Sequence, residues 1–453
     1  MSRVEAIPLD PSAWFFEEKY LVIFEQPLDW NDLDAGSFPQ RVEIGLRKDA
    51  PFAVMETNGY TLRDKYPGVQ EGLAELGKDD APEMGRLLSA NYVNVEHRFF
   101  GDSRPADMSN TDTRYWEYHT AENAAGDYHR IYQALSPLLG DALVATGSSR
   151  GGEMTNVYAY YFPEDMRAYA AYVAPCPVGT EDPRFYEFVY TKIGDDAYGP
   201  EQAAELRGLI TDFQVDLLKY KQTLLPVLEE TALGQMGCIF QAQTPLDQLY
   251  DVIVLEFAAQ FWQYQRVSFE DLRAILDMPD GTPEALQAKQ EAEFAMLMQI
   301  QTPMDWSINF FAWPYYVNAV TTYGQYHYDF SWLRAALAAA GVEDTLSVTE
   351  ALEDGLLWRL VFTEEQRAAF TYDGAFAESL AASIDTTEAK HLMVYGATDP
   401  WISLRLPETD NPNVAVFVHP TEPHSAMIST MPEAVQAEAI AVLQGWLLQD
   451  ADA

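Results

Sequence analysis

The chain has 453 residues, of which 48% are hydrophobic and 13% aromatic, and its formal net charge is −42. This length and apolar content allow a large buried core, and the aromatic content argues against intrinsic disorder. So negative a surface repels phosphate backbones, which argues against nucleic-acid binding, and no stretch is long and apolar enough to predict a membrane span.

The first half of the chain alternates strand-like and helix-like segments. Its start has no basic stretch followed by an apolar run, so the sequence predicts no signal peptide. Period-2 alternation predicts a β-hairpin from two strands, and β-rich runs with one strong helical pattern follow. The predicted strands are residues 20–29, 41–49, 53–59, 91–100, 142–149 and 168–175, and the helical pattern is 120–135. This alternation indicates an α/β protein with a mainly parallel sheet.

The pattern changes after residue 178. Long helical patterns at 200–228 and 282–301 dominate the middle of the chain, and few segments there are typical of strands. Strands return at 391–396 and 414–419, and residues 432–449 have apolar positions at helical spacing. We expect an α/β core split by a large helical cap. The expected boundaries are 1–178 for the first part of the core, 179–385 for the cap and 386–453 for the second part of the core.

Ser149 is the candidate nucleophile. Residues 147–151 read Gly-Ser-Ser-Arg-Gly, a Gly-x-Ser-x-Gly motif between a predicted strand and a predicted helix. This context is typical of the nucleophile elbow of the α/β-hydrolase fold, where a sharp turn lifts the serine above the sheet. The backbone N–H of Arg150 would form half of an oxyanion hole, and that of Tyr60 or Gly59 the other half. The alternative is a glycine-rich turn without catalysis.

The second part of the core supplies a candidate acid and base. This fold places its triad in the order serine, acid, histidine. Asp399 follows the first returning strand, where it would orient the imidazole and stabilise its cation. His424 lies in the loop beyond the next strand and is the preferred base. His419 is the alternative, but it ends that strand and comes too early to reach across.

Several segments carry a family resemblance. They are, in chain order, VEHRFFGDSRP (95–105), the Ser-Arg-Gly-Gly elbow, AYVAP (171–175), LEFAAQFWQY (255–264) and YGATDPW (395–401). Together they resemble the secreted bacterial tripeptidyl aminopeptidases, which are distantly similar to the Pro-X carboxypeptidase and dipeptidyl-peptidase group. The resemblance implies an α/β-hydrolase core with a helical cap, the triad Ser149, Asp399 and His424, and no cofactor or metal. It also implies export and release of di- or tripeptides from a free N-terminus.

An enzyme that measures from the N-terminus needs a carboxylate for the ammonium group. Glu256 is the first candidate, because the aromatic residues around it, including Trp262, could form an apolar pocket that strengthens an ion pair. The alternative is that this aromatic helix packs the core. Glu153 is the second candidate, and its alternative role is to complement the dipole of the elbow helix. The aromatic segment 306–332 either lines the pocket or packs the cap onto the core.

Two enzymatic functions share this machinery. One is an exopeptidase that forms an acyl-enzyme on Ser149, and the other is an esterase that uses the same triad on non-peptide esters. A binding protein without catalysis is a third hypothesis, which a complete triad argues against. A disulfide between Cys176 and Cys238 and two buried free thiols are both open on the sequence alone.

Overall fold

The computed structural model describes residues 1–448 except 67–68, 70, 80, 112, 141, 242–243 and 311. Within these residues, nine strands form one sheet in the order β1-β2-β3-β5-β4-β6-β7-β8-β9. Neighbours from β1 to β5 pair antiparallel, and those from β5 to β9 pair parallel. The strands are β1 Arg3–Ile7, β2 Glu18–Pro27, β3 Ser37–Leu46, β4 Ala53–Glu56, β5 Asn91–Val95, β6 Leu143–Ser148, β7 Ala168–Tyr172, β8 His391–Gly396 and β9 Val414–His419.

Helices flank this sheet and fill the long connection between β7 and β8. Before β7 they are η1 Leu33–Ala35, η2 Arg63–Lys65, α1 Leu73–Leu76, α2 Glu83–Leu88, η3 Trp116–Tyr118, α3 Ala121–Leu139 and α4 Arg150–Tyr161. Between β7 and β8 they are α5 Arg184–Thr191, α6 Asp195–Tyr198, α7 Pro200–Lys219, α8 Lys221–Glu229, η4 Glu230–Gln235, α9 Leu246–Tyr264, α10 Phe269–Leu276, α11 Pro283–Ile300, η5 Pro303–Trp306, α12 Trp313–Asn318, η6 Ala319–Tyr323, α13 Ser331–Ala340, α14 Glu350–Glu353, α15 Leu356–Val361, α16 Glu364–Ala369 and α17 Gly374–Ser383. After β8 they are η7 Pro400–Leu404, η8 Ile428–Thr430 and α18 Glu433–Leu448.

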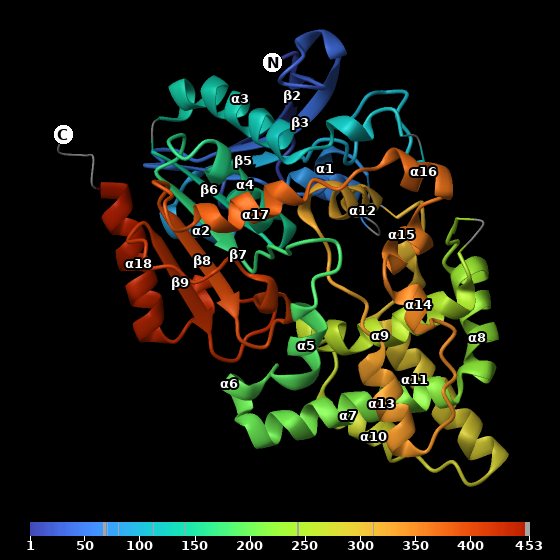
Figure 1. Ribbon diagram of the computed structural model, residues 1–453. Coiled ribbons are helices and arrows are strands. Elements are labelled where there is room, and N and C mark those ends of the chain that lie inside the picture. The colour runs from blue at the N-terminus through green and yellow to red at the C-terminus, as the bar shows by residue number, and fades with distance from the viewer. Residues whose placement is uncertain are drawn as a thin grey trace.

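Both faces of the sheet are covered by helices (Figure 1). Met55 and Ala145 pack with α3, α4 and α17 on one face, and their strand neighbours Val54 and Val144 pack with α2 and α18 on the other. Successive side chains of a strand point to opposite faces, so a strand covered on both sides needs apolar residues at every position. This is why the central strands have continuous apolar sequences.

The structure confirms the predicted α/β-hydrolase fold. The β2–β3 hairpin, the parallel strands β4 to β9 and the long helical connection all lie where the sequence indicates. Two elements differ. The short edge strand β1 was not predicted, because three of its five residues are exposed and its sequence lacks a clear apolar alternation. The pattern over 200–228 forms two helices, α7 and α8, because the chain turns at Tyr220.

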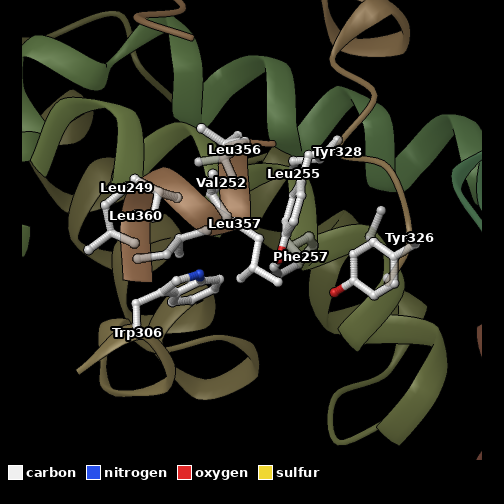
Figure 2. Packing of buried hydrophobic residues seen from close by; sticks show 14 of the residues in the cluster. Leu249, Val252, Leu255, Phe257, Trp306, Tyr326, Tyr328, Leu356, Leu357 and Leu360 are labelled. Carbon is white, nitrogen blue, oxygen red and sulfur yellow. The ribbon is translucent and has the colours of Figure 1, made fainter. Parts of the chain in front are cut away.

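The chain between β7 and β8 builds its own apolar core around α9. Figure 2 shows Leu249, Val252 and Leu255 of this helix packed near Leu356 and Leu360 of α15. Because α9 is buried on almost all sides, its sequence is apolar around most of the helix. Within the described residues, no helix has both the length and the apolar content to cross a bilayer. The domain boundaries near residues 178 and 385 stay predictions, and the end of the last predicted segment, after residue 448, lies outside the described residues.

Candidate active site

Ser149 occupies a strained turn between β6 and α4. Its φ of 56° and ψ of −122° lie outside the regions that non-glycine residues ordinarily adopt. Its N–H donates to the carbonyl of Tyr172, at 2.8 Å, which ties the turn to the end of β7. A Cβ atom added at Gly147 would stand 2.2 Å from the carbonyl oxygen of Gly151, so only glycine allows strand and helix to pass this closely. The motif therefore builds the strained turn expected of a nucleophile elbow.

Asp399 and His424 form a hydrogen-bonded pair. The distance from His424 Nδ1 to Asp399 Oδ2 is 2.7 Å, and the Asp399 side chain is fully buried. Asp399 caps η7, where its Oδ1 accepts the N–H of Trp401 at 3.1 Å. These contacts fix the carboxylate, which in turn orients the imidazole. The other ring nitrogen of His424, Nε2, is buried and has no hydrogen-bond partner among the described residues.

Ser149 and His424 line the same cavity, although no hydrogen bond joins them within the described residues. In an enzyme without substrate, this contact is often long and tightens only when substrate binds. The loop of His424, the predicted base, contacts the helical segment, because the His424 N–H donates to the Gln263 carbonyl of α9 at 3.2 Å.

His419 serves a different purpose. Its Nε2 lies 2.8 Å from the Thr430 carbonyl, and its Nδ1 accepts the N–H of Glu422 at 2.9 Å. Both ring nitrogens are thus occupied in holding the loop that contains His424.

The two predicted oxyanion segments lie against each other. Arg150 is the first residue of α4, so its N–H has no acceptor within the helix. Gly59 has a φ of +82°, and a Cβ atom there would stand 2.9 Å from the Arg150 carbonyl carbon. The N–H of Tyr60 donates to the Asn58 side chain at 3.2 Å. Glycine at position 59 therefore allows the loop after β4 to approach the start of the elbow helix.

The cavity has a volume of about 500 Å³ and holds more carboxylates than cations. Glu153, Glu256 and Asp305 line it, whereas Arg150 and Arg266 are the arginines in its wall. The structure thus brings Ser149, His424 and both predicted anchor carboxylates to one cavity. It also adds Asp305, which no motif in the sequence indicates.

Glu256 is buried among neutral donors. The Tyr326 hydroxyl donates to its Oε1 at 2.5 Å, and Gln301 Nε2 donates to its Oε2 at 3.4 Å. Gln260 Nε2 lies 3.5 Å from the same Oε2 atom. Among the described residues, no cationic side chain pairs with this carboxylate. Burial raises the pKa of Glu256 to about 7, although hydrogen bonds from Tyr326 and Gln260 oppose the rise.

The other two carboxylates each have a cation nearby. Arg150 Nη1 donates to Glu153 Oε2 at 3.0 Å, and burial raises the pKa of Glu153 to about 7 against the attraction of Arg150. Burial likewise raises the pKa of Asp305 to about 6, opposed by the charge of Arg266. Glu256 therefore differs from both, because no described residue places a positive charge beside it.

The structure does not bring Trp262 to the cavity. Its side chain is 1% exposed and packs in the helical core, with its ring near those of Tyr198 and Phe269. The cavity-lining residues of α9 are instead Glu256, Gln260, Gln263 and Tyr264, which come close to helical spacing along one side. That spacing is visible in the sequence and is the signal that separates Glu256 from Trp262.

Aromatic residues of the segment 306–332 form much of the remaining wall. The lining residues from this segment include Trp306, Tyr315, Tyr316, Tyr326 and Tyr328. Trp306, Tyr326 and Tyr328 also belong to the helical core drawn in Figure 2, so the pocket wall is the edge of that core. The segment therefore lines the pocket and also packs into the core of the helical segment.

Neither cysteine pairs and no metal cluster is apparent in the described part of the chain. Cys176 and Cys238 are free and buried. No group of three or more His, Cys, Asp and Glu side chains among the described residues is arranged to hold a metal ion.

Sequence and structure comparisons relate the chain to several known proteins. A sequence model of the PS-10 peptidase S37 family matches residues 1–343. The chain is 31% identical over 264 residues to the prolyl tri/tetrapeptidyl aminopeptidase of Streptomyces mobaraensis, an alignment that covers 56% of this chain and 49% of that protein. It is 29% identical over 185 residues to the prolyl carboxy peptidase like protein 5 of Caenorhabditis elegans, covering 38% of this chain and 36% of that protein. This chain thus matches about half or less of these relatives' length. The solved structure of VinJ aligns with a TM-score of 0.38 and 12% identity, covering 94% of this chain and 99% of that one.

Proposed function

Because the chain belongs to the PS-10 peptidase S37 family, we propose that it is a serine aminopeptidase that releases short peptides from substrates with a free N-terminus. One observation carries this proposal. The cavity that contains Ser149 and His424 also contains a buried carboxylate, Glu256, that lacks a positive partner among the described residues. A substrate ammonium group would supply the missing charge.

The proposed reaction uses Ser149, His424 and Asp399 as a triad. His424 Nε2 takes the proton of the Ser149 hydroxyl as its oxygen attacks the scissile carbonyl, and the same proton then passes to the leaving amine. Asp399 holds Nδ1 and stabilises the imidazolium. The N–H of Arg150, with a donor from Gly59 or Tyr60, stabilises the oxyanion. Water, activated by His424, then hydrolyses the acyl-enzyme and releases the N-terminal peptide.

Glu256 is the better of the two predicted amine anchors. The Glu153 carboxylate is already neutralised by Arg150, so an ammonium group would have to compete with a buried guanidinium. Among the described residues, the hydrogen-bond donors to Glu256 are neutral, so no cationic side chain there competes with a substrate ammonium group. We include Asp305 as a second anion in the same pocket, because it lines the cavity and raises the pKa of Glu256. Two carboxylates attract an ammonium group more strongly than one.

The helical segment 179–385 acts in this proposal as a cap that limits substrate length. It provides Glu256 and Asp305, whereas the core provides the nucleophile. An anchor at a fixed position relative to Ser149 selects peptide bonds a set number of residues from the N-terminus. Aromatic lining residues such as Tyr315 and Trp401 would contact the side chains of the bound peptide. Export, which the family resemblance implies, stays a prediction.

Three chromogenic substrates test the proposal. They are a tripeptide nitroanilide with a free N-terminus, its N-acetylated counterpart and a small nitrophenyl ester. We expect kcat/KM to be at least about 100-fold higher for the free peptide than for the acetylated one, because acetylation removes the charge that meets Glu256. Ser149→Ala should abolish all three activities. Equal cleavage of the free and blocked peptides would overturn the aminopeptidase proposal, and preference for the ester would favour an esterase.

A further inference from the structure

The side chain of Arg150 joins three parts of the molecule around the nucleophile. Its Nε donates to the Gly59 carbonyl at 3.2 Å, in the loop after β4. Its Nη1 donates to Glu153 in the first turn of α4, at 3.0 Å. Its Nη2 donates to Asn318 Oδ1 at 2.5 Å, at the end of α12 in the helical segment. A planar guanidinium has donors in a fixed arrangement, so these three bonds restrict how the parts can sit relative to one another.

The Arg150 side chain is enclosed on several sides. It is 2% exposed, and its guanidinium carbon lies 5.2 Å from the ring centre of Tyr315 and 4.9 Å from that of Tyr323. Asn318, which accepts from it, also donates to the His119 carbonyl at 2.6 Å and is thereby fixed to the core. Both rings and Asn318 come from the chain between β7 and β8. Burial of a guanidinium is favourable only when its donors are satisfied, so the helical segment contributes directly to the stability of this arrangement.

The loop and helix that Arg150 connects are the two segments with the proposed oxyanion donors. One donor is its own N–H, and the other belongs to Gly59 or Tyr60. We propose that the Arg150 side chain is a positioning residue that sets the distance between the two oxyanion donors and makes it depend on the docking of the helical segment. This inference rests on the proposed function and assigns a role to the side chain, apart from that of the Arg150 N–H. Stabilisation of an oxyanion depends on donors held in place before the reaction, so small displacements weaken it.

Arg150→Lys separates this positioning role from a purely electrostatic one. Lysine keeps the positive charge but cannot make the three hydrogen bonds of the guanidinium in the same geometry. The readouts are the inhibition constants of a tripeptide boronic acid, which forms a tetrahedral adduct with the serine, and of the corresponding product peptide, which does not. We expect the boronic acid to bind 10- to 100-fold more weakly to the variant, with a similar fall in kcat, while product affinity changes less than about threefold. Asn318→Ala leaves the guanidinium in place. It should also weaken binding of the boronic acid and lower kcat, each by a smaller factor than Arg150→Lys.

Arg207→Lys is the matched control. Arg207 is also a buried arginine, bonded to the Ile193 carbonyl and to Asp195 in the helical segment, and it does not line the cavity. Its replacement should leave the ratio of the two inhibition constants unchanged. If Arg150→Lys does not fold, as judged by circular dichroism, Asn318→Ala carries the test. Equal weakening of boronic acid and product, or no change in either, would overturn the role of Arg150. Failure of the boronic acid to inhibit the unaltered enzyme would instead refute the proposed function, and this inference with it.

Discussion

Replacing Glu256 with glutamine removes the charge proposed to hold the substrate amine while keeping the shape of the side chain. Two charges about 4 Å apart interact by about 4 kcal/mol at an effective dielectric constant of about 20, a value that suits buried protein sites as well as exposed ones. Desolvation of the ammonium group offsets part of this attraction. We expect kcat/KM for the free tripeptide nitroanilide to fall about 100- to 1,000-fold, with the nitrophenyl ester almost unaffected.

The pH dependence sharpens this prediction. Burial raises the pKa of Glu256 to about 7, so the proposed anchor is mostly charged above that pH and mostly neutral below it. The substrate α-amine loses its charge above about pH 8. The ratio of kcat/KM for the free peptide to that for the acetylated peptide should therefore be greatest between about pH 7 and 8. It should fall about tenfold per unit below pH 7, and Glu256→Gln should remove that fall. Taking the ratio cancels any pH dependence that the two substrates share.

Stability provides an independent check on Glu256→Gln. Because the pKa of Glu256 is raised from 4.5 to about 7 on folding, the folded state binds more protons than the unfolded state between these values. The carboxylate therefore destabilises the fold progressively as the pH rises from about 4.5 to 7, by up to ~3 kcal/mol. The glutamine variant should unfold at the same or a higher temperature than the unaltered protein at pH 8, measured by calorimetry.

Glu293→Gln is the matched control for the activity measurements on Glu256→Gln. Glu293 is a fully buried carboxylate of α11, paired with Lys289 and absent from the cavity wall. Its replacement should leave kcat/KM unchanged. A normal kcat/KM for Glu256→Gln, or equal losses on the peptide and the ester, would refute the reasoning about the anchor.

Four further substitutions test the site and its support. Asp399→Asn should lower kcat about 10⁴-fold with little change in KM, because the imidazole loses its orienting acid, and near-normal turnover would remove Asp399 from the triad. Trp262→Ala should lower the free energy of unfolding in denaturant by about 3–5 kcal/mol without changing KM. A rise in KM without loss of stability would instead indicate that Trp262 contacts the substrate. Gly147→Ala should destabilise the elbow and abolish activity, since its Cβ would stand 2.2 Å from the Gly151 carbonyl oxygen. Gly208→Ala, in open space on α7, should instead raise stability by up to ~1 kcal/mol, and equal effects of the two would contradict the close packing at the elbow.

The sequence predicts best those features that are local. The strand periodicities and the long helical patterns indicate the fold because each depends on neighbours a few residues away. Ser149, Asp399 and His424 could be selected for the same reason, since each follows a predicted strand in the order that this fold requires. The edge strand β1 was missed because its pairing with β2 is the main reason it is a strand.

The pocket was harder to predict because its wall comes from distant segments. Asp305 and Tyr326 reach Glu256 from parts of the chain 49 and 70 residues away, and no local pattern connects them. Trp262 was selected for its aromatic character, although it lies six residues beyond Glu256. At 3.6 residues per turn, that separation places the two side chains far apart around the helix axis. Gln260 and Gln263, at the i+4 and i+7 positions from Glu256, lie on the same side of α9 and also line the cavity.

The insertion of the helical segment between β7 and β8 also determines when activity can arise. Ser149 lies 250 residues before Asp399 (399 − 149), so a ribosome completes the strand before the proposed nucleophile long before it adds the proposed acid. Pairing of β7 with β8, such as Tyr172 beside Val394, must close a loop that contains the whole helical segment. Such distant pairings form late in folding. During synthesis, the growing chain therefore carries Ser149 without its proposed acid and base, and the proposed activity can arise only after the pocket has formed.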